Sequence, residues 1–539
     1  MKNFLNLLIV IFISIPSFSQ NISRPRLVVG IVIDQMRWDY LYRYYSRYPE
    51  GGFKRILKEG FSCSNTFIPY TPTATGPGHT CVYTGSVPAL HGIIGNNWYV
   101  RDQKKLMYCT EDNSFETVGS SSPAGKMSPA NLWSTTICDE LKLAQNFHNR
   151  TIAIALKDRG AILPGGHTAN AAYWFDNASG GWISSTYYMQ ELPAWVKSFN
   201  DKKLPDEYLR KNWNTLYSIN SYTESSIDKN AFENNLIGGT NTFPHQTDSV
   251  NRNKYELFRS TPYGNTYTFE MAKAAIENER LGMSAVTDML ALSFSSTDYV
   301  GHGFGPNSIE VEDVYLRLDK DLAMFLNYLD QKIGKGQYLL FITADHGVAH
   351  VPAFNHEHHL PGGLVNEAAL IKLINDELKS KFNVQGLIVQ VTNYQIYLDN
   401  NLITQNNLDK HAVKQVIIQS LLKNEAIANA VDLSELATAT LPATLKTYIT
   451  NGYNQKLSGD VQFVFKPQWF EGGEKGSNHG LWNPYDAHIP LLWFGWNVKP
   501  GYTNREVYMT DIAPTIAAML HIQMPNASIG KVIEEVKTK

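Results

Sequence analysis

The sequence predicts an α/β protein: a mostly parallel sheet sandwiched by helices, with a cap insertion and a small α/β insertion. Short runs rich in β-branched residues recur along the chain, and helical patterns lie between several of them. Two long stretches interrupt this alternation. Strands that alternate with helices are typical of a parallel sheet covered on both faces. A chain of 539 residues, 43% of them hydrophobic, is long enough to bury such a core.

The strand-like runs cover residues 27–33, 151–156, 289–294, 338–343 and 489–494. The clearest helix is expected to start near Asn307, where Glu310 is placed for a capping box. Apolar residues at helical spacing predict one buried face, formed by Val311, Val314, Leu318, Leu322, Phe325 and Leu329. In open α/β sheets the ligand and active sites lie at the carboxyl ends of the strands, so we expect the site residues directly after these runs.

The two interruptions divide the core into three parts. Residues 177–267 are rich in Asn, Ser, Tyr and Trp with weak periodicity, which suits a cap of loops and short elements over a site. Residues 360–457 predict a small α/β insertion with a helix, an alternating strand at 387–398 and a second helix near 408–422. The core is therefore expected at 24–176, 268–359 and 458–535.

The first residues are typical of a cleavable signal peptide. Lys2 is followed by an apolar stretch from Phe4 to Ile15, then by Pro16 and a short polar stretch that ends at Gln20. The apolar stretch is too short to span a bilayer, and no other segment reaches that length. We therefore expect a signal peptide at 1–20, a periplasmic or secreted mature protein, and no membrane span.

Charge and cysteine content narrow the partners. The net charge of −3 and pI near 6.6 show no global preference for nucleic acid or acidic membranes. We expect a monomer that acts on small molecules, without nucleic acid as a specific partner. The four cysteines, Cys63, Cys81, Cys109 and Cys138, leave two alternatives open: disulfides of unspecified pairing, or free buried thiols.

Two acidic-histidine clusters each follow a predicted strand. Asp298 and His302 follow the run at 289–294 on an expected glycine-rich loop, and Asp345 and His346 follow the run at 338–343. Asp34 ends the first run. Nitrogen and carboxylate ligands without thiolates favour Zn²⁺ or a similar divalent metal. An isolated Asp-His pair is most often a surface turn, but at corresponding strand ends these residues predict metal sites.

One more ligand is needed to complete two sites, and His479 is the best candidate. Its glycine and small polar neighbours allow a close approach of the backbone, although alone it reads as a solvated loop histidine. The histidine-rich run from Asn355 to His359 lacks a strand-end position and precedes Pro361. That run is expected to be an exposed loop.

Thr75 is the candidate nucleophile. It lies on a glycine-rich turn that is predicted to open a helix, with Pro77 in the first helical turn. A threonine hydroxyl attacks poorly at neutral pH, but a metal ion and a helix N-terminus both favour its deprotonated form. Taken alone, such a turn is only a helix cap.

Three further residues are candidates for binding a phosphoryl group. Asn96 can donate from its amide, and Lys157 and Arg159 follow the run at 151–156. A phosphate monoester carries about two negative charges near neutral pH, so it gains more from two cations than a singly charged diester does. The alternative for a Lys-Asp-Arg sequence after a strand is a solvated turn.

These residues, in this order, resemble the alkaline phosphatase superfamily, and within it the flavobacterial periplasmic alkaline phosphatases of the PafA type. The resemblance covers most of the mature chain, including Lys157 to Pro164 and Thr510 to Thr515. It implies one zinc ion held by Asp298, His302 and His479, and a second held by Asp34, Asp345, His346 and the Thr75 oxygen. It also implies a covalent phospho-threonine at Thr75, with Asn96, Lys157 and Arg159 on the phosphoryl oxygens.

The expected function is therefore that of a phosphate-monoester hydrolase of broad specificity that uses two zinc ions and releases inorganic phosphate. Two alternatives remain: a phosphodiesterase or nucleotide pyrophosphatase of the same superfamily, which is expected to lack the Lys157 and Arg159 equivalents, or an exported metal- or phosphate-binding protein without turnover. A sulfatase is excluded, since no cysteine is followed by its formylglycine signal.

Overall fold

A ten-stranded sheet forms the centre of the computed structural model, which describes residues 23–250 and 252–537. The expected signal peptide at 1–20 lies outside the described residues. The strands lie in the order β20 (Gly501–Thr503), β2 (Phe61–Cys63), β19 (Leu491–Gly495), β11 (Tyr338–Thr343), β1 (Leu27–Ile33), β10 (Asp288–Phe294), β7 (Thr151–Ala155), β8 (Ala171–Asp176), β9 (Gly181–Ser185) and β6 (Thr117–Val118). The five strands from β11 to β8 are parallel to one another, and the strands that flank them, β19 and β9, are antiparallel. The predicted fold class is confirmed.

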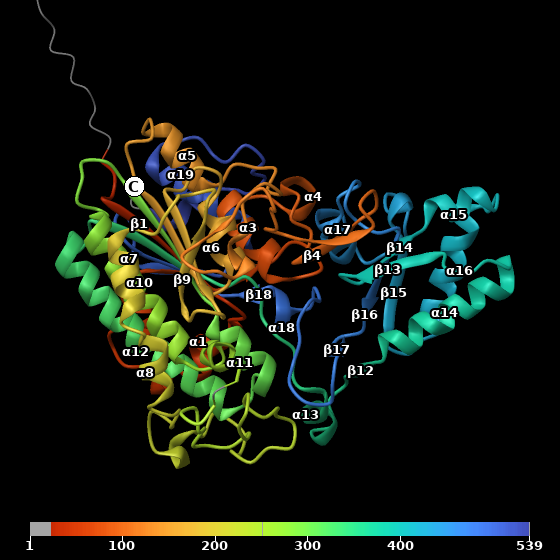
Figure 1. The fold of residues 1–539 in the computed structure, drawn as a ribbon, viewed down its shortest axis with the longest axis horizontal. Helices are drawn as coiled ribbons and strands as arrows, with labels where there is room; N and C mark the ends of the chain where they lie inside the picture. Colours follow the sequence, from red (N-terminus) through yellow and green to blue (C-terminus); the bar gives the residue numbers. More distant parts are fainter. Residues whose placement is uncertain (1–22, 251, 538–539) are drawn as a thin grey trace, which may run out of the picture.

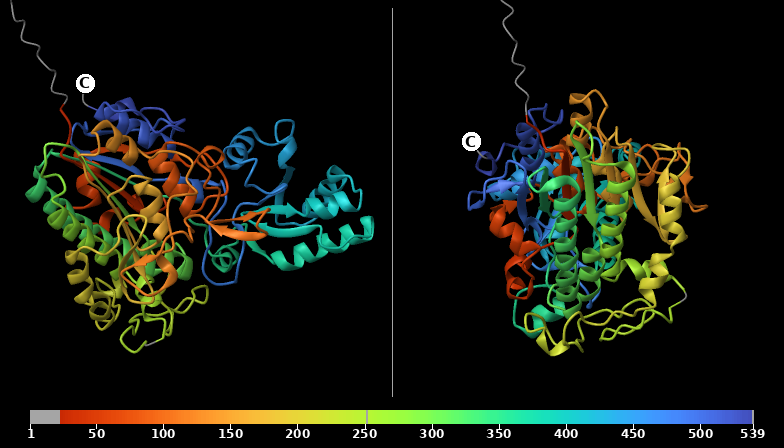
Figure 2. Two further views of the ribbon diagram at one scale, coloured as in Figure 1. Left: turned by 45° about the horizontal axis from the view of Figure 1, so that its top comes forward. Right: turned by 90° about the vertical axis from the view of Figure 1, so that its left-hand side faces the viewer.

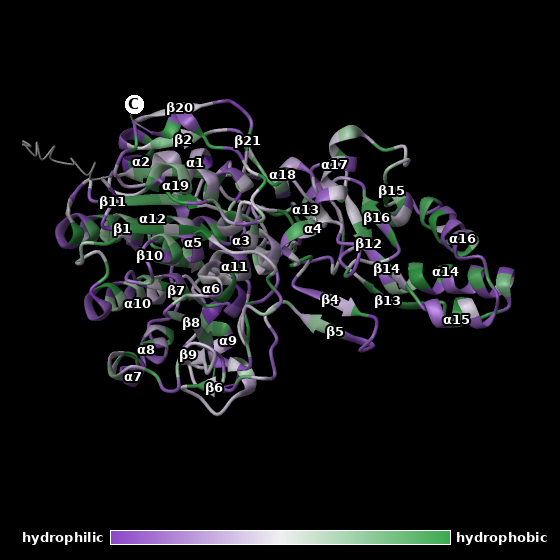
Figure 3. Ribbon diagram, turned by 90° about the horizontal axis from the view of Figure 1, so that it is seen from above, coloured by the Kyte–Doolittle hydropathy of each residue, from purple (hydrophilic) through white to green (hydrophobic). Residues whose placement is uncertain are grey.

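Helices cover both faces of this sheet (Figures 1 and 2). Ser293 and Phe294 are neighbours on β10 and therefore point to opposite faces. The Ser293 hydroxyl forms a hydrogen bond with His79 Nε2 of α3 (Thr75–Thr84), whereas Phe294 packs on Phe269 of α10 (Tyr263–Glu279). Helix α6 (Asp158–Gly165) lies with α3, and α12 (Ile309–Leu329) lies with α10. All residues of the central strands β1, β7, β10 and β11 are buried, and these strands are strongly hydrophobic in Figure 3.

Two predicted elements differ in detail. The run at 489–494 is interrupted by Pro490, which lacks the N–H of a ladder residue; β18 (His488–Ile489) pairs in a separate sheet and β19 starts at Leu491. The predicted capping box at Asn307 is wrong. Ser308 caps α12 by accepting from the Val311 N–H at 3.1 Å, and the Glu310 carboxylate instead accepts from His245 Nε2 at 2.9 Å. The apolar face of α12 is buried as predicted.

The small insertion extends from one side of the core (Figure 1). Helices α14 (Glu367–Phe382) and α16 (Lys410–Leu422) accompany a four-stranded sheet, β13-β14-β16-β15. The single strand predicted at 387–398 is a hairpin of β13 (Ile388–Thr392) and β14 (Gln395–Leu398), because the two residues between them have φ of 55° and 58°, as in a tight hairpin turn. Strands β15 (Ile427–Asp432) and β16 (Val461–Phe465) pair there, so this sheet reaches past the expected end at 457.

The cap consists of short helices and irregular chain at one end of the core. It contains α7 (Ala194–Asp201), α8 (Leu204–Leu209) and α9 (Lys254–Arg259). Strand β9, within the expected cap range, belongs to the central sheet, and α10 begins at Tyr263. The four cysteines are free and buried, as in the second alternative above. Among the described helices, none combines the length and the apolarity needed to cross a bilayer.

Candidate active site

The predicted site residues come together at the carboxyl ends of the parallel strands. Asp34 follows β1, Asp345 follows β11, and Lys157 follows β7. Because these strands run in the same direction side by side, their ends meet at one edge of the sheet. Helix α3 begins at Thr75 and packs against α6, which places the hydroxyl over this edge.

The first metal-ligand group is formed by Asp34, Asp345 and His346. All three side chains are fully buried, and their ligand atoms lie within 4.8 Å of one another. His346 Nε2 lies 3.5 Å from Asp34 Oδ1 and 3.6 Å from Asp345 Oδ2. These residues come from two adjacent strands, so the group needs the sheet to be assembled.

The second group is formed by Asp298, His302 and His479. Asp298 and His302 lie on helix α11 (Ser296–Phe304), where the sequence predicts a loop, and their spacing of one helical turn puts both on one face. His302 Nε2 is 3.2 Å and His479 Nε2 is 4.0 Å from Asp298 Oδ1. His479 arrives from a distant loop and stacks on His346 with ring centroids 3.6 Å apart, so the two groups are neighbours.

Each of the three imidazoles is oriented by a backbone carbonyl. The Nδ1 atom of His302 contacts Ser477 O at 2.8 Å, that of His346 contacts Gly347 O at 3.0 Å, and that of His479 contacts Thr73 O at 3.1 Å. Nδ1–H must donate in these contacts because a carbonyl only accepts. The Nε2 lone pair is therefore free and faces the carboxylates, which is the arrangement of a metal-ligating histidine.

Unpartnered atoms show that this cradle fits metal ions. Asp34 Oδ1, Asp345 Oδ2 and His346 Nε2 are buried, and none of them has a hydrogen-bond partner among the residues that the structure describes. Burial together with repulsion from Asp298 and Asp345 raises the pKa of Asp34 well above its usual range. Burial and the neighbouring histidines lower the pKa of His479, which keeps its ring neutral. Three carboxylates share the site with one lysine, so additional positive charge would stabilise it.

That lysine is Lys157, which is buried between the two groups. Its Nζ lies 2.6 Å from Asp34 Oδ2, 2.5 Å from Asp298 Oδ2 and 3.5 Å from Thr75 Oγ1. Burial works against its charge, but Asp298 and Asp34 outweigh this and raise the pKa of Lys157. The ammonium group therefore stays charged beside the hydroxyl.

Asn96 lies next to the first turn of α3, which begins at Thr75. Its side-chain oxygen accepts from the Gly76 N–H at 2.8 Å, and this contact fixes which end of the amide points away. The amide N–H₂ group is left to donate to a ligand. Glycine at position 76 avoids a tight contact here, because an added Cβ would lie 3.2 Å from that same oxygen.

Arg159 is held by two residues that the sequence did not single out. Its Nη1 donates to Tyr108 Oη at 2.9 Å, and Tyr108 in turn donates to Asp158 Oδ1 at 2.9 Å. Tyr108 ends β5 (Lys105–Tyr108) of the hairpin that also carries β4 (Asn97–Val100), next to Asn96. The Nε atom of Arg159 is buried and has no hydrogen-bond partner in the described part of the chain, so the guanidinium retains a donor.

Gln35 is the other residue that sequence reasoning missed. Its Nε2 donates to Asp298 Oδ1 at 2.8 Å, and its backbone N–H donates to Asp345 Oδ1 at 3.1 Å. It therefore links one carboxylate of each group. Its left-handed backbone, with φ of 64°, is uncommon for glutamine, but no sequence pattern announces that conformation.

Other histidine and acidic residues do not join this centre. The sequence predicts a loop at the histidine-rich run, but its first part forms the short helix α13 (Pro352–Glu357). His356 lies in the last turn of this helix, His358 and His359 follow it, and all three are exposed. In the insertion, His411, Asp432 and Glu435 form a third compact group. Two of its members are exposed, and Lys414 Nζ already lies 2.5 Å from Asp432 Oδ2.

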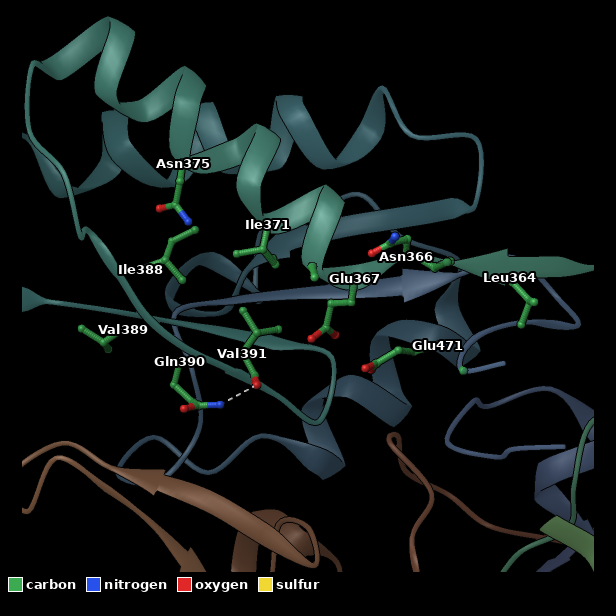
Figure 4. Close-up of a pocket in the computed structure, with 13 residues that line it drawn as sticks. Leu364, Asn366, Glu367, Ile371, Asn375, Ile388, Val389, Gln390, Val391 and Glu471 are labelled. Carbon is green, nitrogen blue, oxygen red and sulfur yellow. Dashed lines mark hydrogen bonds between the residues drawn. The ribbon is translucent and has the colours of Figure 1, made fainter. Parts of the chain in front are cut away.

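A cavity of about 350 Å³ opens beside His479, between the core and the insertion. Its lining includes Thr73, Ala74 and Tyr394, so it adjoins the turn that carries Thr75. Glu367 and Glu471 line this cavity and also a larger one of about 830 Å³ inside the insertion, where their carboxyl groups point toward one another (Figure 4). Burial and Glu471 raise the pKa of Glu367 to about 7.

Several known proteins are similar to this chain over most of its length. The family model described as type I phosphodiesterase / nucleotide pyrophosphatase matches residues 28–487. The chain is 53% identical to alkaline phosphatase PhoV of Synechococcus elongatus over 96% of this chain and 94% of that protein. It is 52% identical to a protein named calcium-transporting ATPase of Myroides odoratus, over 96% and 95%.

A third relative has a solved structure. The chain is 48% identical to alkaline phosphatase PafA of Elizabethkingia meningoseptica over 96% of this chain and 95% of that protein. The crystal structure of PafA superposes with a TM-score of 0.94 and covers 96% of this chain and 99% of that one. A second PafA structure carries substitutions of one threonine, one asparagine, one lysine and one arginine.

Proposed function

The chain belongs to the type I phosphodiesterase / nucleotide pyrophosphatase family of the alkaline phosphatase superfamily, and from that premise we propose that it is an alkaline phosphatase of broad specificity. In this proposal the enzyme forms a covalent phospho-threonine at Thr75, uses two zinc ions and releases inorganic phosphate. Two relatives at 48–53% identity over most of the chain are named alkaline phosphatases. They support hydrolysis of phosphate monoesters and do not favour the phosphodiesterase alternative.

One observation carries the proposal: the Thr75 hydroxyl lies beside a buried ammonium that contacts one carboxylate of each metal-ligand group. Lys157 Nζ is 3.5 Å from Thr75 Oγ1, and among the described residues this ammonium forms ion pairs with Asp34 and Asp298, one from each group. A binding protein without turnover has no need for a hydroxyl in this position. The four residue types replaced in the PafA variant match Thr75, Asn96, Lys157 and Arg159 in order and nearly in spacing.

Asp34, Asp345 and His346 would hold one zinc ion with the Thr75 oxygen, and Asp298, His302 and His479 would hold the other. When bound, the ions supply positive charge that favours the deprotonated hydroxyl and neutralises charge on the phosphoryl oxygens and the leaving oxygen. The donor set of nitrogen and oxygen atoms without sulfur suits Zn²⁺.

The chain's own residues then perform the phosphoryl transfer. Thr75 Oγ1 attacks phosphorus at the start of α3, where the helix N-terminus favours negative charge. Lys157, Arg159 and the Asn96 amide bind the phosphoryl oxygens, which orients the group for in-line displacement. The P–O bond to the alcohol breaks, and water later cleaves the phospho-threonine to regenerate Thr75 and release phosphate.

The same residues account for the preference between esters. A monoester has one more negative charge than a diester, and the buried Lys157 and the half-buried Arg159 supply two positive charges to neutralise it. We further propose a monomer that acts on small-molecule phosphate monoesters, without nucleic acid as a specific partner, exported to the periplasm or outside through a cleaved signal peptide.

The test is hydrolysis of a chromogenic aryl phosphate by zinc-loaded protein and by its Thr75→Ala variant. We expect the variant to lose at least about a thousandfold in kcat while its zinc content and melting temperature stay close to those of the wild type. Chelation of the wild type should abolish turnover, and added Zn²⁺ should restore it. Activity that survives in Thr75→Ala, or after complete chelation, would overturn the proposal.

A further inference from the structure

The β13–β14 hairpin of the insertion reaches the catalytic centre through its two-residue turn. We call Asn393 and Tyr394 the hairpin turn. Strand β13 lies against β4 of the core, which brings the turn to the strand that follows Asn96 (Figures 1 and 3). The same turn lines the cavity of about 350 Å³ beside His479. One short segment of the insertion therefore meets two parts of the site.

Tyr394 holds the backbone of the metal-ligand candidate His479. Its hydroxyl donates to His479 O at 3.1 Å. Its ring packs on Phe465 with ring centroids 5.2 Å apart, and its own carbonyl accepts from the Phe463 N–H at 3.0 Å, so the hydroxyl is presented from a fixed base. A Cβ added at Gly480 would lie 2.5 Å from this hydroxyl oxygen. Glycine at position 480, whose φ is 130°, therefore leaves room for the contact.

His479 lies on a loop, so its position depends on such contacts. Residues 472–483, all of them described by the structure, form neither helix nor strand. Thr73 O orients the His479 ring through Nδ1, and Tyr394 holds the His479 carbonyl. A ring that is held at one point still tilts with its backbone. The two contacts together therefore set the direction of Nε2.

Asn393 holds the chain on both sides of the phosphoryl-binding candidate Asn96. Its Nδ2 donates to Asn97 O at 2.7 Å. Its side chain also lies against Gly95, where an added Cβ would be 2.4 Å from Nδ2. Asn96 itself accepts from the Gly76 N–H, as described above. With its two chain neighbours fixed by Asn393, the Asn96 amide keeps one direction for its remaining donor.

We propose that Asn393 and Tyr394 are positioning residues for the phosphatase reaction, Tyr394 through His479 and Asn393 through Asn96. This inference rests on the function proposed above. Neither side chain touches the reacting atoms, because each acts on a backbone carbonyl, at 3.1 Å for Tyr394 and at 2.7 Å for Asn393. The insertion then contributes to the geometry of the centre, although every site residue predicted from the sequence lies in the core.

The first measurement is zinc retention in Tyr394→Phe, by equilibrium competition with a zinc-binding dye. The variant keeps the ring on Phe465 and loses only the donor to His479 O. We expect one of the two zinc ions to be held about tenfold more weakly, since contacts behind a metal ligand typically contribute that much or more. Tyr397→Phe is the matched control. It removes, from the same hairpin, a hydroxyl that donates to Leu457 O at 3.0 Å, and it should retain zinc as the wild type does.

The second measurement is the affinity of zinc-saturated Asn393→Gly for inorganic phosphate, by calorimetry. Glycine adopts the left-handed backbone of this position without strain and lacks only the side-chain amide. We expect phosphate to bind about fivefold more weakly, as for the loss of one hydrogen bond, with zinc retention unchanged. Zinc-saturated Tyr394→Phe should bind phosphate within about twofold of the wild type.

The two variants must give these different signatures. Wild-type zinc retention in Tyr394→Phe or wild-type phosphate affinity in Asn393→Gly would overturn the proposal. Equal losses of both properties in both variants would also overturn it, because they would show only that the insertion stabilises the core. None of these measurements needs turnover. A wild-type protein that binds zinc and phosphate but does not hydrolyse a monoester would therefore contradict the proposed function and leave the contacts of the turn to be judged separately.

Discussion

Removal of the Lys157 and Arg159 charges together should separate monoester from diester hydrolysis. In Lys157→Ala/Arg159→Ala the phosphoryl oxygens lose two charged donors. Lys157 Nζ lies 3.5 Å from Thr75 Oγ1, so an oxygen of a phosphoryl group on Thr75 is within its reach. A charge-assisted hydrogen bond contributes about 1.5–3 kcal/mol. Two of them correspond to about 3–6 kcal/mol, or roughly 10²–10⁴-fold in kcat/KM for a monoester.

The diester should lose far less, about tenfold, because it lacks the extra charge that both cations neutralise. The assay compares kcat/KM for an aryl phosphate and for its methyl aryl diester in the same preparations. Lys197→Ala, at an exposed lysine paired with Glu191 in the cap, is the control and should leave both rates unchanged.

Lys157 also contacts Asp34 and Asp298, so its loss could disturb the metal ions. Zinc content must therefore be measured in the double variant. Equal losses on the two substrates in protein with full zinc content would refute the assignment, because a general defect lowers both rates and a charge-selective one does not.

Three further predictions follow, two from contacts around the site and one from a buried carboxyl of α12. Tyr108→Phe removes the acceptor of Arg159 and should lower monoester kcat/KM about fivefold without changing the melting temperature by more than a degree or two; an unchanged rate would contradict the positioning role. Gln35→Met removes a donor from a metal-ligand carboxylate and should weaken zinc retention about 10–100-fold, measured by competition with a zinc-binding dye; wild-type retention would argue against it. Burial raises the pKa of Asp319 from 3.8 to about 7. The folded state therefore binds this proton more tightly than the unfolded state does. As the pH rises from 4 to above 7, up to roughly 4 kcal/mol of the free energy of unfolding is lost. Asp319→Asn, which keeps an acceptor for the Phe53 N–H, should reduce that loss in denaturant titrations at pH 5 and pH 8, and an identical loss in both proteins would refute the cause.

Much of the site could be predicted because its residues follow local patterns. Strand runs are visible from short-range composition, and their ends identify Asp34, Asp345 and Lys157 without knowledge of the strand order. The run at 387–398 shows the limit of such reasoning. The alternation of apolar and polar residues continues through the turn at Asn393 and Tyr394. Both residues have positive φ values, and this pair of residue types does not by itself predict such a turn.

What the sequence by itself determined is the set of residues that carry charge and chemistry at strand ends, and the alternating architecture that brings those ends to one edge. Only the tertiary structure decided which groups support them. Gln35 reaches Asp298 across 263 residues, and Tyr108 reaches Arg159 across 51. Such contacts depend on how separate segments pack, and hydrophobic periodicity specifies which face of a segment is buried but not which polar partner it meets there.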